Sequence, residues 1–178
     1  GRQTIYGITK DSFIRIANKF QLPLKDSQAT EILNGSDGYA DGIYRWLGAT
    51  SVDSFDYSSY EKATHLWDMN DQLSNGVAGQ YDFVFDGGTL EHVFNYTGAL
   101  RESMTLPRVG GILLSGTPAN SYLGHGFYQL GPDLPFAVLN AHNGYTFGQA
   151  LLIEMRYRSR FYEILPPSVR EGRALAST

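Results

Sequence analysis

Three segments of this chain each end on an aspartate, at Asp56, Asp68 and Asp86. Each aspartate follows a short stretch of apolar or alternating residues, which is typical of a strand. Ligands bind outside the carboxyl ends of parallel strands, so these carboxylates would line one rim of a sheet. Their oxygens accept hydrogen bonds from a ribose diol, an exocyclic amino group or a cationic group. For a single aspartate a helix cap is an equally good interpretation, but three together favour a nucleoside site.

Two of the four histidines lie beside the same predicted rim. His125 stands between two glycines in a loop rich in aromatic residues, and His92 follows Glu91 just after a predicted strand. An imidazole with an unperturbed pKa near 6.5 can take a proton from a hydroxyl or an amine. His125 is therefore the first candidate for a general base and His92 the second. The alternatives are loop packing for His125 and a helix cap for His92, and His65 and His142 have no predicted role.

A metal site can be imagined from Asp86, Glu91, His92 and His125, whose oxygens and nitrogens suit Zn, Mn or Fe. Their spacing matches no closed ligand motif, so the sequence predicts no metal site. The chain has no cysteine, which excludes thiol catalysis and thiolate ligands. It also contains neither a Gly-Lys-Ser or Gly-Lys-Thr phosphate loop nor a Gly-x-Ser-x-Gly nucleophile elbow.

One unit of strand, turn and helix, Tyr81–Thr105, must position most of these side chains. The apolar run 82–85 predicts a central strand, which stops at Asp86-Gly87-Gly88. From Leu90 to Met104 apolar residues recur at steps of three and four, which predicts one continuous amphipathic helix.

The rest of the chain alternates predicted helices and strands. Helices are expected at 13–20, capped by Thr9 or Asp11, for one turn at 29–33, at 39–47, ended by Gly48, and at 133–140. Strands are expected at 51–56, 65–70 and 112–116, with an antiparallel edge formed by 144–155 and 158–164. This alternation predicts an α/β fold with a mostly parallel sheet, a Rossmann-like three-layer sandwich in a single domain over residues 1–178.

The composition excludes several partners. The net charge is −4, which gives no support for a nucleic-acid or membrane surface. The basic residues at 156–160 are interleaved with apolar ones, which favours a half-exposed strand over a phosphate track. No apolar run approaches the length of about 20 residues that a membrane span needs, and no signal-peptide pattern opens the chain. The default localisation is therefore cytoplasmic.

Three segments carry a resemblance to a known family: VDSFDYSSYEKATHLWDMN, YDFVFDGGTLEHVFNYTGALRESMTLPRVGGILLSGTPAN and GHGFYQLGPDL. Over roughly Tyr39 to Glu163 the chain resembles a bacterial branch of the class I methyltransferases, which use S-adenosylmethionine. The resemblance implies that Asp56 holds the ribose hydroxyls and that Asp68 with Met69 contacts the adenine. It also implies that Asp86-Gly87-Gly88 lies near the methionine moiety and the methyl group.

The chain differs from the family's pattern at the glycine loop that should follow the first strand. Asn34–Gly38 is one candidate, but the residues before it form a poor strand. We favour Gly1-Arg2-Gln3 as this loop. Gly1 would then contact the cofactor, and the first strand would lie upstream of Gly1. The chain would then be a trimmed version that lacks its first strand, and the residues 173–176 stop where a final strand would be expected.

The resemblance implies transfer of a methyl group from S-adenosylmethionine to a small-molecule acceptor, which the sequence does not identify. The alternative is a binding or scaffold protein that keeps the fold without turnover. A dinucleotide-binding protein is disfavoured because G-x-G-x-x-G is absent. An open sheet edge could pair with a second copy, so a homo-oligomer is a further expectation.

Overall fold

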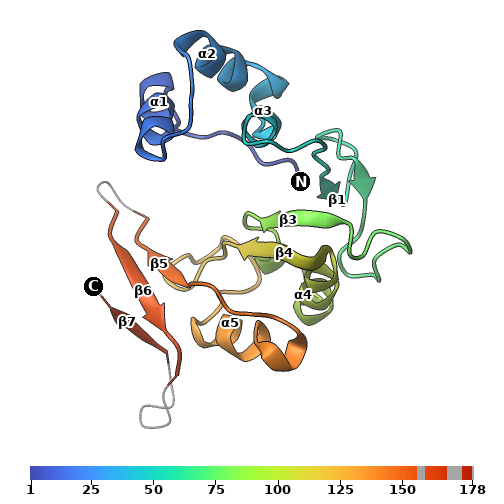
Figure 1. The fold of residues 1–178 in the computed structure, drawn as a ribbon. Coiled ribbons are helices and arrows are strands. Elements are labelled where there is room, and N and C mark those ends of the chain that lie inside the picture. Colours follow the sequence, from blue (N-terminus) through green and yellow to red (C-terminus); the bar gives the residue numbers. More distant parts are fainter. Residues whose placement is uncertain (156–158, 168–173, 178) are drawn as a thin grey trace.

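The computed structural model describes residues 1–155, 159–167 and 174–177. It is a mixed α/β fold (Figure 1). The α-helices are α1 (Lys10–Lys19), α2 (Asp26–Asn34), α3 (Asp41–Trp46), α4 (Tyr96–Thr105) and α5 (Asp133–Val138). Short 3-10 helices are η1 (Ser36–Gly38), η2 (Leu90–His92) and η3 (Ala141–Asn143). The strands are β1 (Phe55–Asp56), β2 (His65–Leu66), β3 (Tyr81–Asp86), β4 (Pro107–Ser115), β5 (Leu151–Ile153), β6 (Phe161–Leu165) and β7 (Leu175–Ser177).

The strands form three separate sheets in the described part of the chain, where one mostly parallel sheet was expected. β1 pairs with β2 and β3 pairs with β4, both in parallel, while β5, β6 and β7 are antiparallel. β1 and β2 are only two residues long. β1 ends at Asp56 because Oδ1 of this residue accepts a hydrogen bond from the backbone of Ser58 (2.7 Å), which turns the chain away. The predicted strand 65–70 ends at Leu66, so Asp68 lies beyond it.

The β3–β4 pair is the centre of the molecule, as the apolar runs predict. Phe83 is paired with Ile112 and Val84 with Leu113, and paired residues share a face of the sheet. The face with Val84 and Leu113 is half-buried, whereas Phe83 is 44% and Ile112 61% exposed. Figure 1 shows α4 and α5 on one side of this pair and α1–α3 on the other. The helices α1–α3 thus leave much of their side of the pair uncovered.

The predicted continuous helix from Leu90 to Met104 is wrong. The chain forms the single turn η2, becomes extended at Val93, and starts α4 only after Asn95. The side chain of Asn95 caps α4 by accepting a hydrogen bond from the backbone of Gly98 (3.3 Å). The apolar spacing holds across the break because Leu90, Val93 and Ala99 still pack into one buried cluster.

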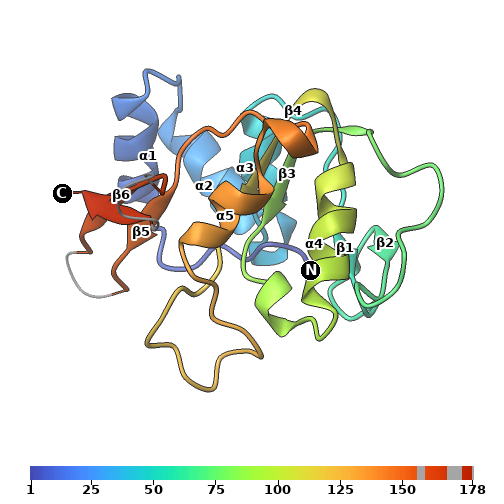
Figure 2. The ribbon, with the colours of Figure 1, turned by 90° about the horizontal axis from the view of Figure 1, so that it is seen from below.

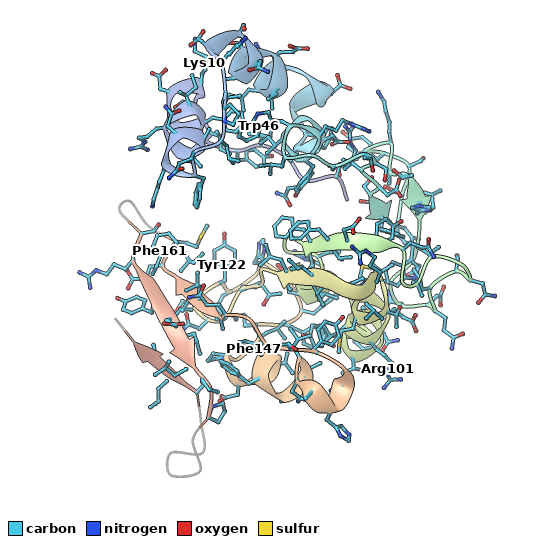
Figure 3. The ribbon with its side chains drawn as sticks, in the orientation of Figure 1. Lys10, Trp46, Arg101, Tyr122, Phe147 and Phe161 are labelled. Carbon is cyan, nitrogen blue, oxygen red and sulfur yellow. The ribbon has the colours of Figure 1, made fainter. Side chains whose placement is uncertain are left out.

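The N-terminal helices follow their sequence signals closely. Thr9 caps α1 by accepting from the backbone of Ser12, as predicted. α2 spans nine residues and is longer than the single turn expected. Gly48 follows α3 with a φ of +106°, the left-handed conformation that a glycine adopts without cost. Phe13 of α1 meets Trp46 of α3 edge to face, with ring centres 5.2 Å apart, and Trp46 is labelled in Figure 3.

The C-terminal strands confirm the predicted antiparallel pair, since β5 pairs with β6. They form a sheet of their own instead of an edge of the parallel sheet. The residues 156–158, which belong to the predicted basic strand, lie outside the described residues. β7 adds a third strand, which pairs with β6. It lies near residues 173–176, where the sequence led us to expect that the final strand is missing. No helix in the described ranges is long and apolar enough to cross a membrane.

Candidate functional site

The residues 1–3 run between the carboxyl ends of the two parallel pairs. The amino group of Gly1 donates to the carbonyl oxygen of Phe55 (2.7 Å) and lies 3.3 Å from Oδ2 of Asp56. Two residues on, Oε1 of Gln3 lies against Gly87, where a Cβ atom would overlap it. The side chain of Gln3 thus brings residues 1–3 to the turn after β3. A row of contacts thus joins the end of β1 to the end of β3.

Asp56 keeps its charge in this setting. Partial burial raises the pKa of its carboxyl group, but the hydrogen bond from Ser58 and the nearby Gly1 ammonium lower it more, and the net shift is downward. Oδ1 is occupied by Ser58, and Oδ2 faces Gly1. An ionised carboxylate with one oxygen directed at this row can accept hydrogen bonds from a ligand.

Asp68 and Met69 lie in the loop after β2 and are held to the start of α4. Oδ1 of Asp68 accepts from the backbone and side chain of Asn70 (2.9 and 2.8 Å). Asn70 in turn accepts from the backbone and side chain of Asn95 (2.9 and 3.1 Å). Met69 packs against the buried cluster around Leu90. Asp68 and Met69, the residues predicted to contact adenine, are therefore held against the start of α4.

Asp86 has a structural role that the sequence left as an alternative. Its Oδ1 accepts from the backbone of Thr89 (2.9 Å), and its Oδ2 accepts from the hydroxyl of Ser115 (2.8 Å). These bonds hold the turn after β3 and fix it to the end of β4. Gly88 has a φ of +94°, and a Cβ atom there would lie 3.1 Å from Oε1 of Glu91. The glycine turn thus brings the chain against the Glu91 carboxylate.

Glu91 and the two candidate bases meet in one cluster. Glu91 is 1% exposed, and its Oε1 lies 3.5 Å from Nε2 of His125 and 3.9 Å from Nε2 of His92. The two imidazole rings are 4.9 Å apart, and the ring of Tyr122 stands 4.5 Å from that of His125. Tyr122 is labelled in Figure 3. We call Glu91, His92 and His125 the Glu-His-His cluster.

The loop that carries His125 is fixed by the backbone of Glu91. The carbonyl oxygen of Glu91 accepts from the backbone of Phe127 and of Tyr128 (2.8 and 3.2 Å). A Cβ atom at Gly126 would lie 2.8 Å from that oxygen, so this close approach requires glycine. The hydroxyl of Tyr128 also donates to the carbonyl of Phe94 (2.7 Å). Figure 2 shows the loop beyond the end of β4, beside the turn that follows β3.

The electrostatics of this region are negative. The pKa of Tyr96 is raised to about 12 by burial, and further by the charges of Asp86 and Glu91. Tyr96 therefore stays protonated at neutral pH and can only donate or accept hydrogen bonds there. Cationic groups are favoured beside these carboxylates.

Tyr96 received no predicted role, and Glu91 was considered only as a member of an imagined metal site, although both lie in the resembling segment. The two apolar neighbours of Glu91, Leu90 and Val93, gave no sign that the carboxylate is buried as well. It becomes buried because the distant loop 121–128 folds over η2. Only the adjacent pair Glu91-His92 offered a signal in the sequence, and it was too short to distinguish a site from a helix cap.

His65 belongs to a second group, at the opposite end of β3. The hydroxyl of Tyr81 donates to Oδ2 of Asp53 (3.1 Å) and lies 3.4 Å from Nε2 of His65. The ring of Phe55 stacks on that of His65, with centres 4.8 Å apart. This group connects β1 and β2 to β3 and lies away from the candidate site.

No family model, curated protein sequence or solved structure matches the chain.

Proposed function

We propose that this protein binds S-adenosylmethionine and transfers its methyl group to a small-molecule acceptor. The observation that carries the proposal is the continuous row of contacts along the carboxyl ends of both parallel pairs. It runs from Asp56 through Gly1 and Gln3 to Gly87 and Gly88, and from there to Glu91. Ligands of open α/β folds bind at this edge. The presence of resembling segments at this edge supports the proposal, and we propose a Rossmann-like relationship on the same ground.

The cofactor roles are distributed along this row. Asp56 would accept hydrogen bonds from the ribose hydroxyls through Oδ2, and Asp68 and Met69 would contact the adenine. Gly87 and Gly88 would let the methionine moiety approach the backbone. Asp86 would act by shaping the turn, because both of its oxygens are already bonded to Thr89 and Ser115.

The chemistry would depend mainly on positioning. The acceptor atom forms a bond to the methyl carbon while the bond from carbon to sulfur breaks, and neutral S-adenosylhomocysteine leaves. Holding the two reactants in line supplies most of the rate enhancement of such a displacement. Where the acceptor is a hydroxyl or an amine, its proton would pass to His125, with His92 as the second candidate. Glu91 would stabilise the imidazolium that forms.

One observation favours the alternative of a binding protein without turnover. Oδ2 of Asp56 already lies 3.3 Å from the nitrogen of Gly1, so the ribose hydroxyls must compete with this contact. A folded chain that fails to bind the cofactor would support this alternative.

The test is a calorimetric titration of the 178-residue chain with S-adenosylmethionine and with S-adenosylhomocysteine, in buffer containing a chelator. Hydrogen bonds to a charged group contribute about 1.5–3 kcal/mol, so Asp56→Ala should weaken binding roughly tenfold to a hundredfold. Asp11→Ala, at an exposed position in the first turn of α1, is the matched control and should bind like the unaltered chain. Absence of binding by the folded chain, or equal binding by Asp56→Ala, would refute the proposal.

A further inference from the structure

The Glu-His-His cluster has the composition and convergence of a metal site. One ligand atom from each of Glu91, His92 and His125 lies within 4.8 Å of the other two. Both imidazoles direct Nε2 at the same carboxylate oxygen, at 3.5 and 3.9 Å. These separations are longer than the 2.7–3.2 Å, approximately, of an N–H···O hydrogen bond. The three side chains thus approach a common centre without bonding to one another.

The burial of Glu91 adds an independent observation. Its side chain is 1% exposed, and its Oε2 has no hydrogen-bond partner. A buried carboxylate without a partner costs several kcal/mol, so buried charges are normally paired or coordinate metals. An uncharged imidazole does not compensate the charge of a buried carboxylate. A divalent cation would do so.

We propose that Glu91, His92 and His125 bind a divalent transition-metal ion, with Zn²⁺ as the first candidate. Two imidazoles and one carboxylate form a ligand set that holds Zn²⁺ in hydrolytic enzymes and Fe²⁺ in oxygenases, with positions left open for a substrate. Among the ions with which this set is compatible, the general order of affinities places Zn²⁺ above Mn²⁺ and Fe²⁺. The sequence predicts no metal site. The structure brings together three of the four residues considered there, whereas Asp86 bonds to Thr89 and Ser115 instead.

The backbone already holds these ligands in place. Phe127 and Tyr128 donate to the carbonyl of Glu91, which fixes the loop of His125 over η2. Ligands at about 2.0–2.1 Å from a metal lie roughly 3 Å from one another. The distances between the three ligand atoms must therefore shorten, by amounts from a fraction of an ångström up to about 2 Å. The side chains of His92 and His125 are 47% and 42% exposed, so rotation of these side chains can bring the ligand atoms closer together.

This inference does not depend on the proposed methyl transfer. An imidazole that ligates a metal is not a free base, so an occupied site would activate an acceptor hydroxyl through the ion, which lowers the pKa of a bound hydroxyl. Metal binding is measured without S-adenosylmethionine, and cofactor binding is measured with a chelator present. Failure of one proposal therefore leaves the other standing.

The test is a titration of the metal-free 178-residue chain with Zn²⁺ by equilibrium dialysis, and with Co²⁺ as a probe whose visible spectrum reports its coordination. We expect one tightly bound equivalent and a Co²⁺ spectrum typical of nitrogen and oxygen ligands. Zn²⁺ should also raise the thermal unfolding midpoint, because an ion that binds only the folded state stabilises it. Absence of a bound equivalent would overturn the proposal.

Variants separate the cluster from adventitious binding. Glu91→Gln keeps the shape of the side chain and removes its charge, and His125→Asn removes a ligand whose side chain is half-exposed. Changes around metal ligands typically cost about 10–100-fold in affinity, so loss of a ligand should cost at least that much. His142→Asn, at an exposed position in η3, should bind like the unaltered chain. Binding by His125→Asn equal to that of His142→Asn would contradict the proposal.

Discussion

Tyr81 joins the two parallel pairs at the end opposite the candidate site. Burial, the Asp53 charge and the hydrogen bond to Asp53 raise the pKa of its phenol from 10.0 to about 12. Folding therefore favours the protonated phenol. The stability that this group contributes is fully present below pH 10 and is lost as the pH rises toward 12.

Asp53→Asn should lower the pKa of Tyr81 toward 10.0, because the variant removes the carboxylate charge. The ultraviolet absorbance of tyrosinate reports the titration, and circular dichroism shows over which pH range the chain stays folded. Tyr81→Phe identifies the contribution of this phenol, since Tyr96 also titrates at about 12. Superimposable titrations of Asp53→Asn and the unaltered chain would contradict the expectation.

The start of α4 is the element that connects the buried cluster, the loop of Asp68 and the Glu-His-His cluster. Asn95 stops the chain from continuing η2 as a helix and caps α4 through its side-chain oxygen. The same residue donates to the backbone carbonyl of Asn70 (3.1 Å). A single side chain thus sets both the break and the position of the Asp68 loop.

Asn95→Ala should lower the free energy of unfolding by about 1 kcal/mol, the usual cost of removing a side-chain N-cap. Asn95→Asp keeps an oxygen that can accept from Gly98 and loses only the bond to Asn70, so it should cost less. Urea denaturation followed by circular dichroism measures both variants. If Asn95→Asp cost as much as Asn95→Ala, the cap would not be the source of the stabilisation.

At the scale of the molecule, the three sheets of the described residues are held together by side chains and loops instead of by a continuous ladder of strands. Tyr145, in the segment between η3 and β5, donates its hydroxyl to the carbonyl of Met104 at the end of α4 (2.6 Å). It therefore ties the C-terminal part of the chain to the helix that covers the β3–β4 pair. Phe136 and Phe147, with ring centres 4.5 Å apart, pack in the same region, and Phe147 is labelled in Figure 3.

Tyr145→Phe should lower the free energy of unfolding by about 1 kcal/mol, because it removes one hydrogen bond and leaves the Met104 carbonyl partly buried. Tyr57→Phe, at a side chain that is 77% exposed, is the matched control and should change the value little. Urea denaturation of the two variants side by side is the measurement. Equal effects would show that the bond to Met104 does not hold these parts together.

The sequence determined the elements whose signals are local. The run that ends at Asp86 became β3, Thr9 caps α1, and Gly48 follows α3 in the left-handed conformation. The antiparallel pairing of β5 with β6 was also predictable. Each of these depends on residue periodicity or on the conformational preference of a single residue, which neighbours in the chain are sufficient to set.

Only the tertiary structure decided the composition of the candidate site. Glu91 is buried, and His92 and His125 meet beside it, because a loop distant in the sequence donates hydrogen bonds to the carbonyl of Glu91. The break before α4 and the division into three sheets likewise depend on long-range partners such as the Asn70–Asn95 and Tyr81–Asp53 bonds. Periodicity records which residues share a face, but it does not record which distant segment will cover that face.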